Sequence, residues 1–156
     1  MARLLLASTV LALAAWAASD AFALPPLSAA DRAAAFKAAG YKPYGKQWVR
    51  CVEEGTGQHP TGEMEVADLN GDGRPEAWIR EGSTYCYGAT GSAVTLVTKT
   101  ADGTWRNILD EVGIDGLMPA KHAGWPDIDV GGPGFGPVPV FRFNGVKYVQ
   151  AGTHRQ

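Results

Sequence analysis

The sequence has few of the residues from which catalytic and zinc centres are commonly built. Its 156 residues include two cysteines, Cys51 and Cys86, and three histidines, His59, His122 and His154. There is no Cys-x-x-Cys pair, and no two histidines stand at the spacing of a zinc site. A zinc finger and a dithiol redox motif are therefore excluded. No serine lies in a Gly-x-Ser-x-Gly sequence, so the nucleophile motif of the α/β-hydrolases is missing as well.

Runs of charge of one sign are also missing. The chain has 14 lysines and arginines against 16 aspartates and glutamates, and its formal net charge is −2. The basic residues stand singly along the sequence. Since nucleic acids are bound through clustered Lys and Arg side chains, we expect no nucleic-acid partner.

A long hydrophobic run occurs at one place, the N-terminus. Arg3 is followed by sixteen uncharged residues that end at Ser19, and Ala21-Phe22-Ala23 then fits the small-x-small rule for signal peptidase. A membrane span needs about 20 apolar residues, more than this run supplies. We therefore expect residues 1–23 to be a cleaved signal peptide. The mature chain, residues 24–156, is then expected to be periplasmic or secreted and to have no membrane span.

The two cysteines suit that compartment. In an oxidising environment an even pair of cysteines is typical of a disulfide, and we expect Cys51 to be bonded to Cys86. In the chain-entropy model such a bond stabilises the fold by about 3–4 kcal/mol. The alternative is a pair of buried free thiols.

Frequent turn residues indicate a fold of short strands. The chain contains 20 glycines and 10 prolines, and segments that alternate between polar and apolar residues lie between them. We expect strands at 46–52, 63–67, 76–80, 92–100, 105–109, 138–143 and 146–151. Asp102-Gly103 and Asn144-Gly145 predict two hairpin turns. The expected fold is mainly β (α+β), a single domain of antiparallel β-sheets built from hairpins.

One helix is expected, at the N-terminus of the mature chain over residues 28–40. Ser28 can cap its first turn, Asp31 occupies the position of a capping-box acid, and Gly40 is placed to end it. We expect this helix to act as a brace for the β-rich remainder.

Two segments of the chain are similar to each other. Residues 75–79 and 126–130 both begin with proline and an acid, and both precede a hairpin with a glycine turn. The similarity indicates a possible two-copy β-repeat. Chance similarity between short strands is the alternative.

The loop 68–76 has a metal-binding pattern. Oxygen-bearing residues occupy positions 1, 3, 5 and 9, a glycine at position 6 permits a sharp turn, and position 7 offers a backbone carbonyl. The ligands that this spacing predicts are Asp68, Asn70, Asp72, Arg74 through its carbonyl, and Glu76. Calcium is a hard cation that prefers oxygen ligands, and we expect Ca²⁺ as the cofactor.

The loop departs from an EF-hand at position 12. That position requires a bidentate glutamate, and the chain has Ile79 there. The segment that leaves the loop also has the pattern of a strand rather than of a helix. Fewer protein ligands predict weak affinity, with a dissociation constant on the order of 10⁻⁴ M. The alternative is a tight turn in which Asp68 and Asn70 bond to nearby backbone groups.

The segment 66–76, Val-Ala-Asp-Leu-Asn-Gly-Asp-Gly-Arg-Pro-Glu, resembles the calcium loops of FG-GAP and VCBS-type repeats. In that family the acid-rich loop joins two strands. The resemblance implies a β-sheet fold and calcium ligation by Asp68, Asn70, Asp72 and Glu76. A β-propeller requires at least four blades, for which residues 24–156 are too few. The whole chain is also similar to small exported proteobacterial proteins that carry such a loop, which implies no activity.

The remaining features favour a binding module over an enzyme. Residues 85–88, with two tyrosines, and the glycine-rich residues 131–137 are expected to form surface loops, and loops with rigid aromatics are common binding surfaces. We expect a recognition module of the cell envelope with a protein or carbohydrate ligand.

A small secreted hydrolase that acts on carbohydrate or another envelope polymer is the alternative function. It would use His59 or His122 with Asp127, or a carboxylate pair of Asp127 and Asp129. A solvated strand face is the simpler interpretation of those two aspartates. His154 is expected to lie in a disordered C-terminal tail.

Overall fold

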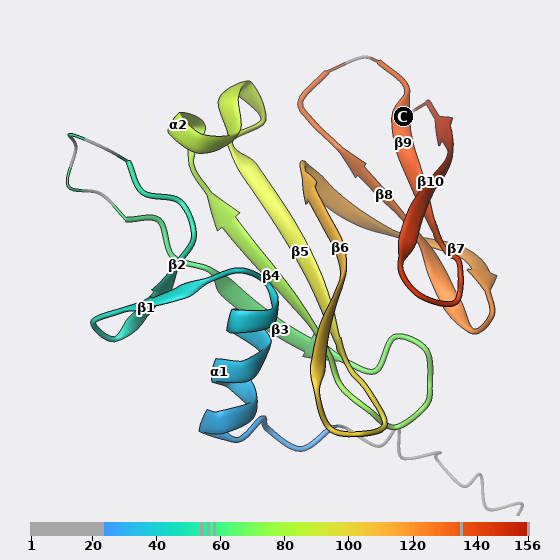
Figure 1. Cartoon of the computed structure of the whole chain (residues 1–156). Helices are drawn as coiled ribbons and strands as arrows, with labels where there is room; N and C mark the ends of the chain where they lie inside the picture. Colours follow the sequence, from blue (N-terminus) through green and yellow to red (C-terminus); the bar gives the residue numbers. More distant parts are fainter. Residues whose placement is uncertain (1–23, 54, 56, 58, 135, 156) are drawn as a thin grey trace, which may run out of the picture.

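Two four-stranded antiparallel sheets and an outer layer make up the described part of the chain. The computed structural model describes residues 24–53, 55, 57, 59–134 and 136–155, and the expected signal peptide lies outside them. The first sheet contains β3 (Glu63–Ala67), β4 (Glu76–Gly82), β5 (Ser92–Lys99) and β6 (Trp105–Val112), in that order. The second contains β7 (Ile114–His122), β8 (Trp125–Gly131), β9 (Val138–Phe143) and β10 (Tyr148–His154), again in chain order. The expected mainly β fold is confirmed (Figure 1).

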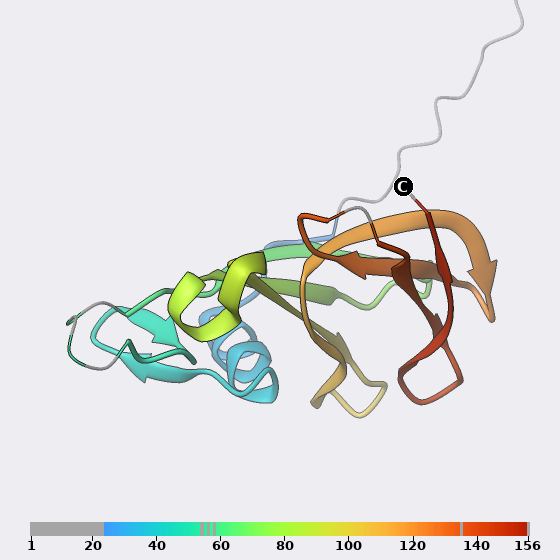
Figure 2. The same ribbon diagram turned by 90° about the horizontal axis from the view of Figure 1, so that it is seen from above.

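The outer layer consists of helix α1 (Ala29–Ala38) and a hairpin of β1 (Lys42–Tyr44) and β2 (Gln47–Val49), which lie on the same side of the first sheet (Figure 2). The helix lies where the sequence predicts one. The Ser28 hydroxyl accepts a hydrogen bond from the Asp31 N–H at 3.0 Å, which satisfies a donor of the first turn. Gly40, with φ of 85°, follows the helix in the left-handed region. Among the described residues, no helix is both long enough and apolar enough to cross a membrane.

Each half of the chain builds one of the two sheets as a four-stranded meander. The similar segments 75–79 and 126–130 fall on β4 and β8, the second strand of each meander. Glu76 of β4 pairs with Thr98 of β5. Asp127 of β8 likewise faces β9, where its carboxylate accepts a hydrogen bond from Arg142. The acid that follows the proline therefore has an equivalent place in both halves.

Equivalent connections of the two halves also lie side by side. At one end, a β-carbon built on Gly124 in the β7–β8 turn would lie 3.5 Å from the Asn70 carbonyl oxygen in the β3–β4 loop. At the other end, a β-carbon on Gly132 would lie 2.9 Å from Thr90 Oγ1. The chain crosses between the halves at Gly113, where a β-carbon would come within 2.4 Å of the Val130 side chain. Glycine is needed there because the strands approach so closely.

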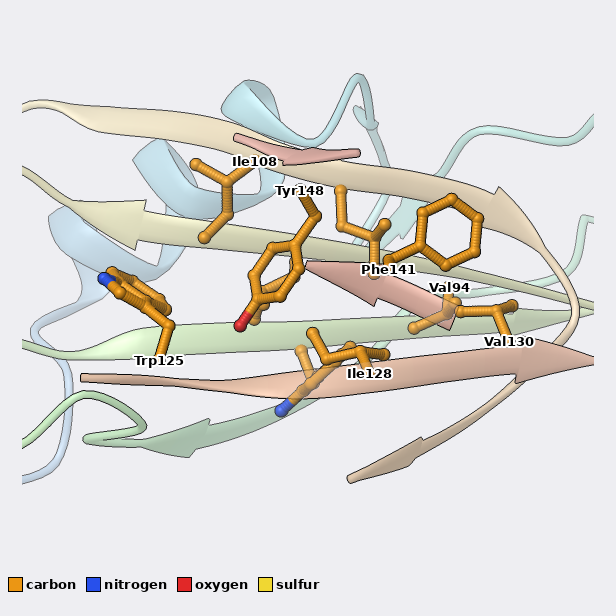
Figure 3. Close-up of a cluster of buried hydrophobic side chains, with 10 residues drawn as sticks. Val94, Ile108, Trp125, Ile128, Val130, Phe141 and Tyr148 are labelled. Carbon is orange, nitrogen blue, oxygen red and sulfur yellow. The ribbon is translucent and has the colours of Figure 1, made fainter. Parts of the chain in front are cut away.

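The main core lies between the two sheets (Figure 3). Its buried members come from β4, β5 and β6 on one side and from β8, β9 and β10 on the other. They are Trp78, Val94, Leu96, Ile108, Leu109, Trp125, Ile128, Val130, Phe141 and Tyr148. Burial of one such side chain contributes about 1.5–3 kcal/mol, so this cluster is the principal reason that the two meanders pack together. The Tyr148 hydroxyl donates to the Pro126 carbonyl oxygen at 2.8 Å, which satisfies the polar end of a buried ring.

A smaller core holds the outer layer onto the first sheet. Phe36 of α1 packs with Ala77, Ile79 and Val97 from β4 and β5. These residues alternate along their strands with members of the main core, so the first sheet is apolar on both faces. Nearly every residue of β4 and β5 is therefore buried, including those that the alternating sequence pattern would place in solvent.

Two expectations are wrong, and one strand is not predicted. Residues 85–88 do not form a loop, because Thr84–Tyr87 is helix α2 and Gly88–Thr90 is the 3₁₀ helix η1. The Ser83 hydroxyl accepts the Cys86 N–H at 3.1 Å and caps α2. The sequence also does not predict β7, whose alternation is broken by Gly116 and Pro119. His154 ends strand β10 rather than lying in a disordered tail.

Candidate functional site

The loop 68–76 joins β3 to β4, so a strand enters it and a strand leaves it (Figure 1). Asp68 turns inward over the loop. Its Oδ1 accepts the N–H groups of Gly71 and Asp72 at 2.8 and 3.1 Å, and its Oδ2 accepts the N–H of Gly73 at 2.9 Å. Gly71 and Gly73 have φ of 77° and 79°, a conformation that glycine adopts without strain. The loop thus closes around the carboxylate at position 1.

Asn70 and Asp72 continue the same inward pattern. Asn70 Oδ1 accepts the Asp72 N–H at 2.9 Å, and Asp72 Oδ1 accepts the Arg74 N–H at 2.8 Å. The Asp72 carboxylate also forms an ion pair with the Arg74 guanidinium. The sequence pattern assigns Arg74 a role through its backbone carbonyl. It does not indicate that the Arg74 side chain pairs with the carboxylate of Asp72 at position 5.

Glu76 lies at the start of β4 and is fully buried, with 0% of its surface exposed. Its Oε2 accepts the Leu69 N–H at 2.8 Å, and its Oε1 accepts the Thr98 hydroxyl at 2.7 Å. Burial raises the pKa of this carboxyl to about 7, and the neighbouring charges of Asp72 and Asp68 act in the same direction. The two hydrogen bonds lower the pKa but do not offset burial. A nearby cation would stabilise the ionised form.

The predicted ligands share one loop, but they do not form a preformed cluster of acids. Within the part of the chain that the structure describes, no three His, Cys, Asp or Glu side chains are grouped so that they could hold a metal ion. Asp68 and Asp72 face N–H groups of the loop, and Glu76 faces Thr98, an arrangement that suits carboxylates that repel one another.

The donor set nevertheless fits a hard cation. Each carboxylate or amide oxygen has two lone pairs, and an oxygen that accepts one N–H keeps a second acceptor site. Asp68, Asn70, Asp72 and Glu76 together supply only oxygen donors, the type that calcium prefers. Asp68 Oδ1 already accepts two N–H groups, so the free acceptor sites lie on oxygens such as Asp68 Oδ2 and Asn70 Oδ1, each of which accepts one.

A second polar group lies across β7, β8 and β9. The Asp127 carboxylate, on a residue only 3% exposed, accepts from Arg142 Nη2 at 3.0 Å and contacts His122 Nδ1 at 2.8 Å. The structure thus brings His122 and Asp127 into contact, as the hydrolase alternative requires. It also buries Asp127, whereas the interpretation of a solvated strand face places this acid in solvent. Burial acts to raise the pKa of Asp127, but the bonds to Arg142 and His122 hold it below its ordinary value. Asp127 thereby ties β7, β8 and β9 together, and its lowered pKa does not suit the acid of a glycosidase carboxylate pair.

Asp129, two residues further along β8, has a different partner. Its Oδ2 contacts His154 Nε2 at 2.7 Å, which ties the last strand, β10, to β8. A β-carbon on Gly116 would lie 2.2 Å from Asp129 Oδ1, so glycine at that position leaves room for the carboxylate. The remaining candidate, His59, packs its ring 4.3 Å from the ring of Tyr44. The two aspartates of the proposed carboxylate pair are therefore each engaged by a separate histidine.

Cys51 and Cys86 form the expected disulfide, with their Cα atoms 6.2 Å apart. The bond ties α2 to the segment that follows β2. Beside it, the buried Glu81 carboxylate accepts the N–H groups of Arg50 and Cys51 at 3.1 and 3.3 Å and also the Tyr87 hydroxyl. Covalent and polar contacts therefore fix the same two segments to the first sheet.

Comparison with known proteins adds no relative to these observations. No family model matches the chain, and neither a curated protein nor a solved structure matches it. The candidate site accordingly stands on the residues and contacts of the chain itself.

Proposed function

We propose that this chain is an exported, calcium-binding β-rich domain that acts by recognition rather than by catalysis, in the periplasm or outside the cell. The observation that carries the proposal is the arrangement of the loop 68–76. Three oxygen-bearing side chains turn inward over one short turn, and the buried carboxylate of Glu76 lies at its exit. An ordinary turn needs one or two such side chains.

Calcium would be held by side-chain oxygens of Asp68, Asn70, Asp72 and Glu76 and by the carbonyl of Arg74. The bound ion would supply positive charge to three carboxylates that otherwise repel one another. The Arg74 side chain, which is paired with Asp72, would compete with the ion for this carboxylate. Such competition, together with the missing ligand at position 12, accounts for an affinity on the order of 10⁻⁴ M, in the range of extracellular calcium modules.

Export is supported by the disulfide, because disulfides persist mainly in oxidising compartments. Recognition is supported over the carboxylate-pair form of the hydrolase alternative by the two aspartates of β8. Asp127 is buried and ion-paired, and Asp129 is engaged by His154, so neither has the environment of a glycosidase acid.

Isothermal titration of the exported protein with calcium tests this proposal. The wild-type protein should bind one calcium ion, and Asp68→Ala should bind none, because the loop then loses both a ligand and the group around which it closes. Asp102→Ala is the matched control. Asp102 also holds a turn by accepting a backbone N–H, that of Thr104 at 3.0 Å, but its turn lacks the ligand pattern. Equal loss of binding in both variants, or no binding by the wild-type protein, would overturn the proposal.

A further inference from the structure

A groove of about 440 Å³ runs between α1 and the β1–β2 hairpin, a volume within the range of small-ligand sites. Figure 2 shows the two elements on the same side of the first sheet. The side chains that matter for its chemistry are Arg32, Phe36, Lys46, Gln47, Trp48 and Thr61. None of them belongs to the loop 68–76.

The floor of the groove is aromatic. The rings of Phe36 and Trp48 are stacked, with centroids 5.2 Å apart and planes 4° from parallel. Phe36 is buried, whereas Trp48 keeps part of its surface exposed. Ala29 and Ala33 of α1 add small apolar side chains to the same lining. A flat ligand surface with apolar C–H groups would pack on the exposed part of Trp48, which Phe36 supports from below.

The rim of the groove is cationic. Arg32 of α1 and Lys46 of the hairpin are both exposed, and neither forms an ion pair within the part of the chain that the structure describes. The Arg32 guanidinium lies 5.4 Å from the centre of the buried Phe36 ring, which leaves the partly exposed Trp48 as the aromatic surface open to a ligand. The nearest acid in the sequence, Asp31, is paired with Lys99 at 2.7 Å. No acidic residue is among those that line the groove.

Basic and acidic residues are distributed unequally between the outer layer and the rest of residues 24–156. Residues 24–49, which contain α1 and the hairpin, have four lysines and arginines and one aspartate, whereas residues 50–156 have nine basic and fourteen acidic residues. The basic residues are single along the sequence, but the fold places two of them on one groove of a positive layer in an acidic molecule. This arrangement selects for a negatively charged ligand.

We propose that this groove binds an acidic sugar residue, such as a uronic acid within a polysaccharide. The sugar carboxylate would pair with Arg32 and Lys46, and one face of the ring would pack on the floor formed with Trp48. The Gln47 amide and the Thr61 hydroxyl offer a donor and acceptors for the ring hydroxyls. An acidic peptide would satisfy the two cations but would have no flat apolar face for the floor. The assignment rests on the proposed recognition function, and it does not require calcium.

The test is to titrate the exported protein with trigalacturonate in EDTA. Binding is measured by isothermal titration calorimetry and by tryptophan fluorescence. EDTA removes calcium bridging between the loop and the sugar. Trigalacturonate should bind at least tenfold more tightly than the neutral trisaccharide maltotriose and the peptide triglutamate. The preference should weaken as salt rises from 50 to 300 mM, because the exposed charges are then screened.

Variants locate the site. Arg32→Gln with Lys46→Gln should weaken trigalacturonate binding at least tenfold. Lys37→Gln with Lys42→Gln removes the same charge from the same layer but outside the groove lining, and it should change binding less than twofold. Lys46→Gln alone, in an exposed turn, keeps the test valid if the Arg32 variant is unstable.

Each contrary result has a definite meaning. Equal losses in the two double variants would show general charge attraction and overturn the groove assignment. Equal binding of triglutamate would assign the groove to acidic peptides, and no binding of trigalacturonate would reject it as a sugar site. The calcium titration is independent of these results, so failure of this inference is distinguishable from failure of the calcium-binding proposal.

Discussion

Among single residues, Arg74 is the one whose side chain would compete with a cation for the loop. Its guanidinium is paired with the Asp72 carboxylate, and its side chain is 44% exposed. Exposed ion pairs of this kind contribute about 0–1 kcal/mol. A cation that took Asp72 as a ligand would compete with this pair, so the side chain of a residue whose carbonyl is a proposed ligand should lower the affinity of the site.

Arg74→Ala should therefore raise the affinity for calcium by about two- to fivefold, which corresponds to the free energy of one exposed ion pair. The backbone carbonyl at position 7 is retained. Calcium titration calorimetry measures the change. Lys37→Ala on α1 removes the same charge from the molecule and should leave the affinity unchanged. Weaker binding by Arg74→Ala would show that the guanidinium supports the site rather than competes for it.

Glu76 is the second residue with a separable effect. Its carboxyl is fully buried and has a raised pKa because burial disfavours the charged form. Glu76→Gln keeps the size of the side chain and can still accept the Leu69 N–H. In EDTA at pH 8 the variant should be more stable than the wild-type protein by about 1–2 kcal/mol in urea denaturation.

The same variant should gain less from calcium, since one ligand charge is lost. The two effects have opposite signs, and a purely structural role of Glu76 would not produce them together. A variant that is less stable in EDTA yet responds normally to calcium would remove Glu76 from the ligand set.

Among the elements, the strands β7, β8 and β9 are linked by the side-chain contacts of one buried carboxylate. Asp127 joins His122 of β7 to Arg142 of β9, and its pKa is held below the ordinary value of 3.8. A group whose pKa is lower in the folded state than in the unfolded state stabilises the fold above the unfolded value. That contribution is lost as the pH falls through the folded value.

Asp127→Asn should therefore lower the free energy of unfolding by about 1–3 kcal/mol at pH 7 and should lose less stability than the wild-type protein as the pH falls below about 4. Urea denaturation from pH 2 to pH 7 measures both effects. Asp129→Asn, which disturbs only the contact with His154, is the control. Parallel pH curves for the wild-type protein and Asp127→Asn would contradict the assigned role.

The sequence predicts elements that contain their own signals. Ser28 and Gly40 mark the ends of α1, and glycine turns mark the hairpins of β5–β6 and β9–β10. Strand β7 escapes prediction because Gly116 and Pro119 break its alternation, and its pairing depends on β8. The strand expected at 46–52 is reduced to Gln47–Val49, which pairs with β1.

The candidate loop follows the same rule. Its ligand spacing is local, so the oxygen-bearing positions can be predicted from nine consecutive residues. Strand pairing brings distant residues together, and two contacts depend on it. They are the hydrogen bond of Thr98 to Glu76 and the contact of His122 with Asp127. The groove between α1 and the hairpin is likewise visible only in the folded chain, because its two cations come from separate elements.

In the whole molecule, the candidate calcium loop lies where the two halves meet. The Asn70 carbonyl lies close to the β7–β8 turn of the second meander, and Glu76 at the loop's exit bonds to β5 of the first. A cation that fixes the loop would therefore stabilise the contact between the halves as well as the loop itself. Binding to the folded state alone adds RT ln(1 + [Ca²⁺]/Kd) to the free energy of unfolding.

The most direct test is a thermal melt of residues 24–156, the proposed mature chain, in EDTA and in 1 mM calcium. With a dissociation constant on the order of 10⁻⁴ M the stabilisation is about 1.4 kcal/mol, which should raise Tm by roughly 3–6 °C. Magnesium should raise it less, because that ion demands octahedral geometry and loses water reluctantly. Asp72→Asn should reduce the shift, and Asp68→Ala should abolish it. Superimposable wild-type curves in EDTA and calcium would contradict the account and leave the loop as an ordinary turn.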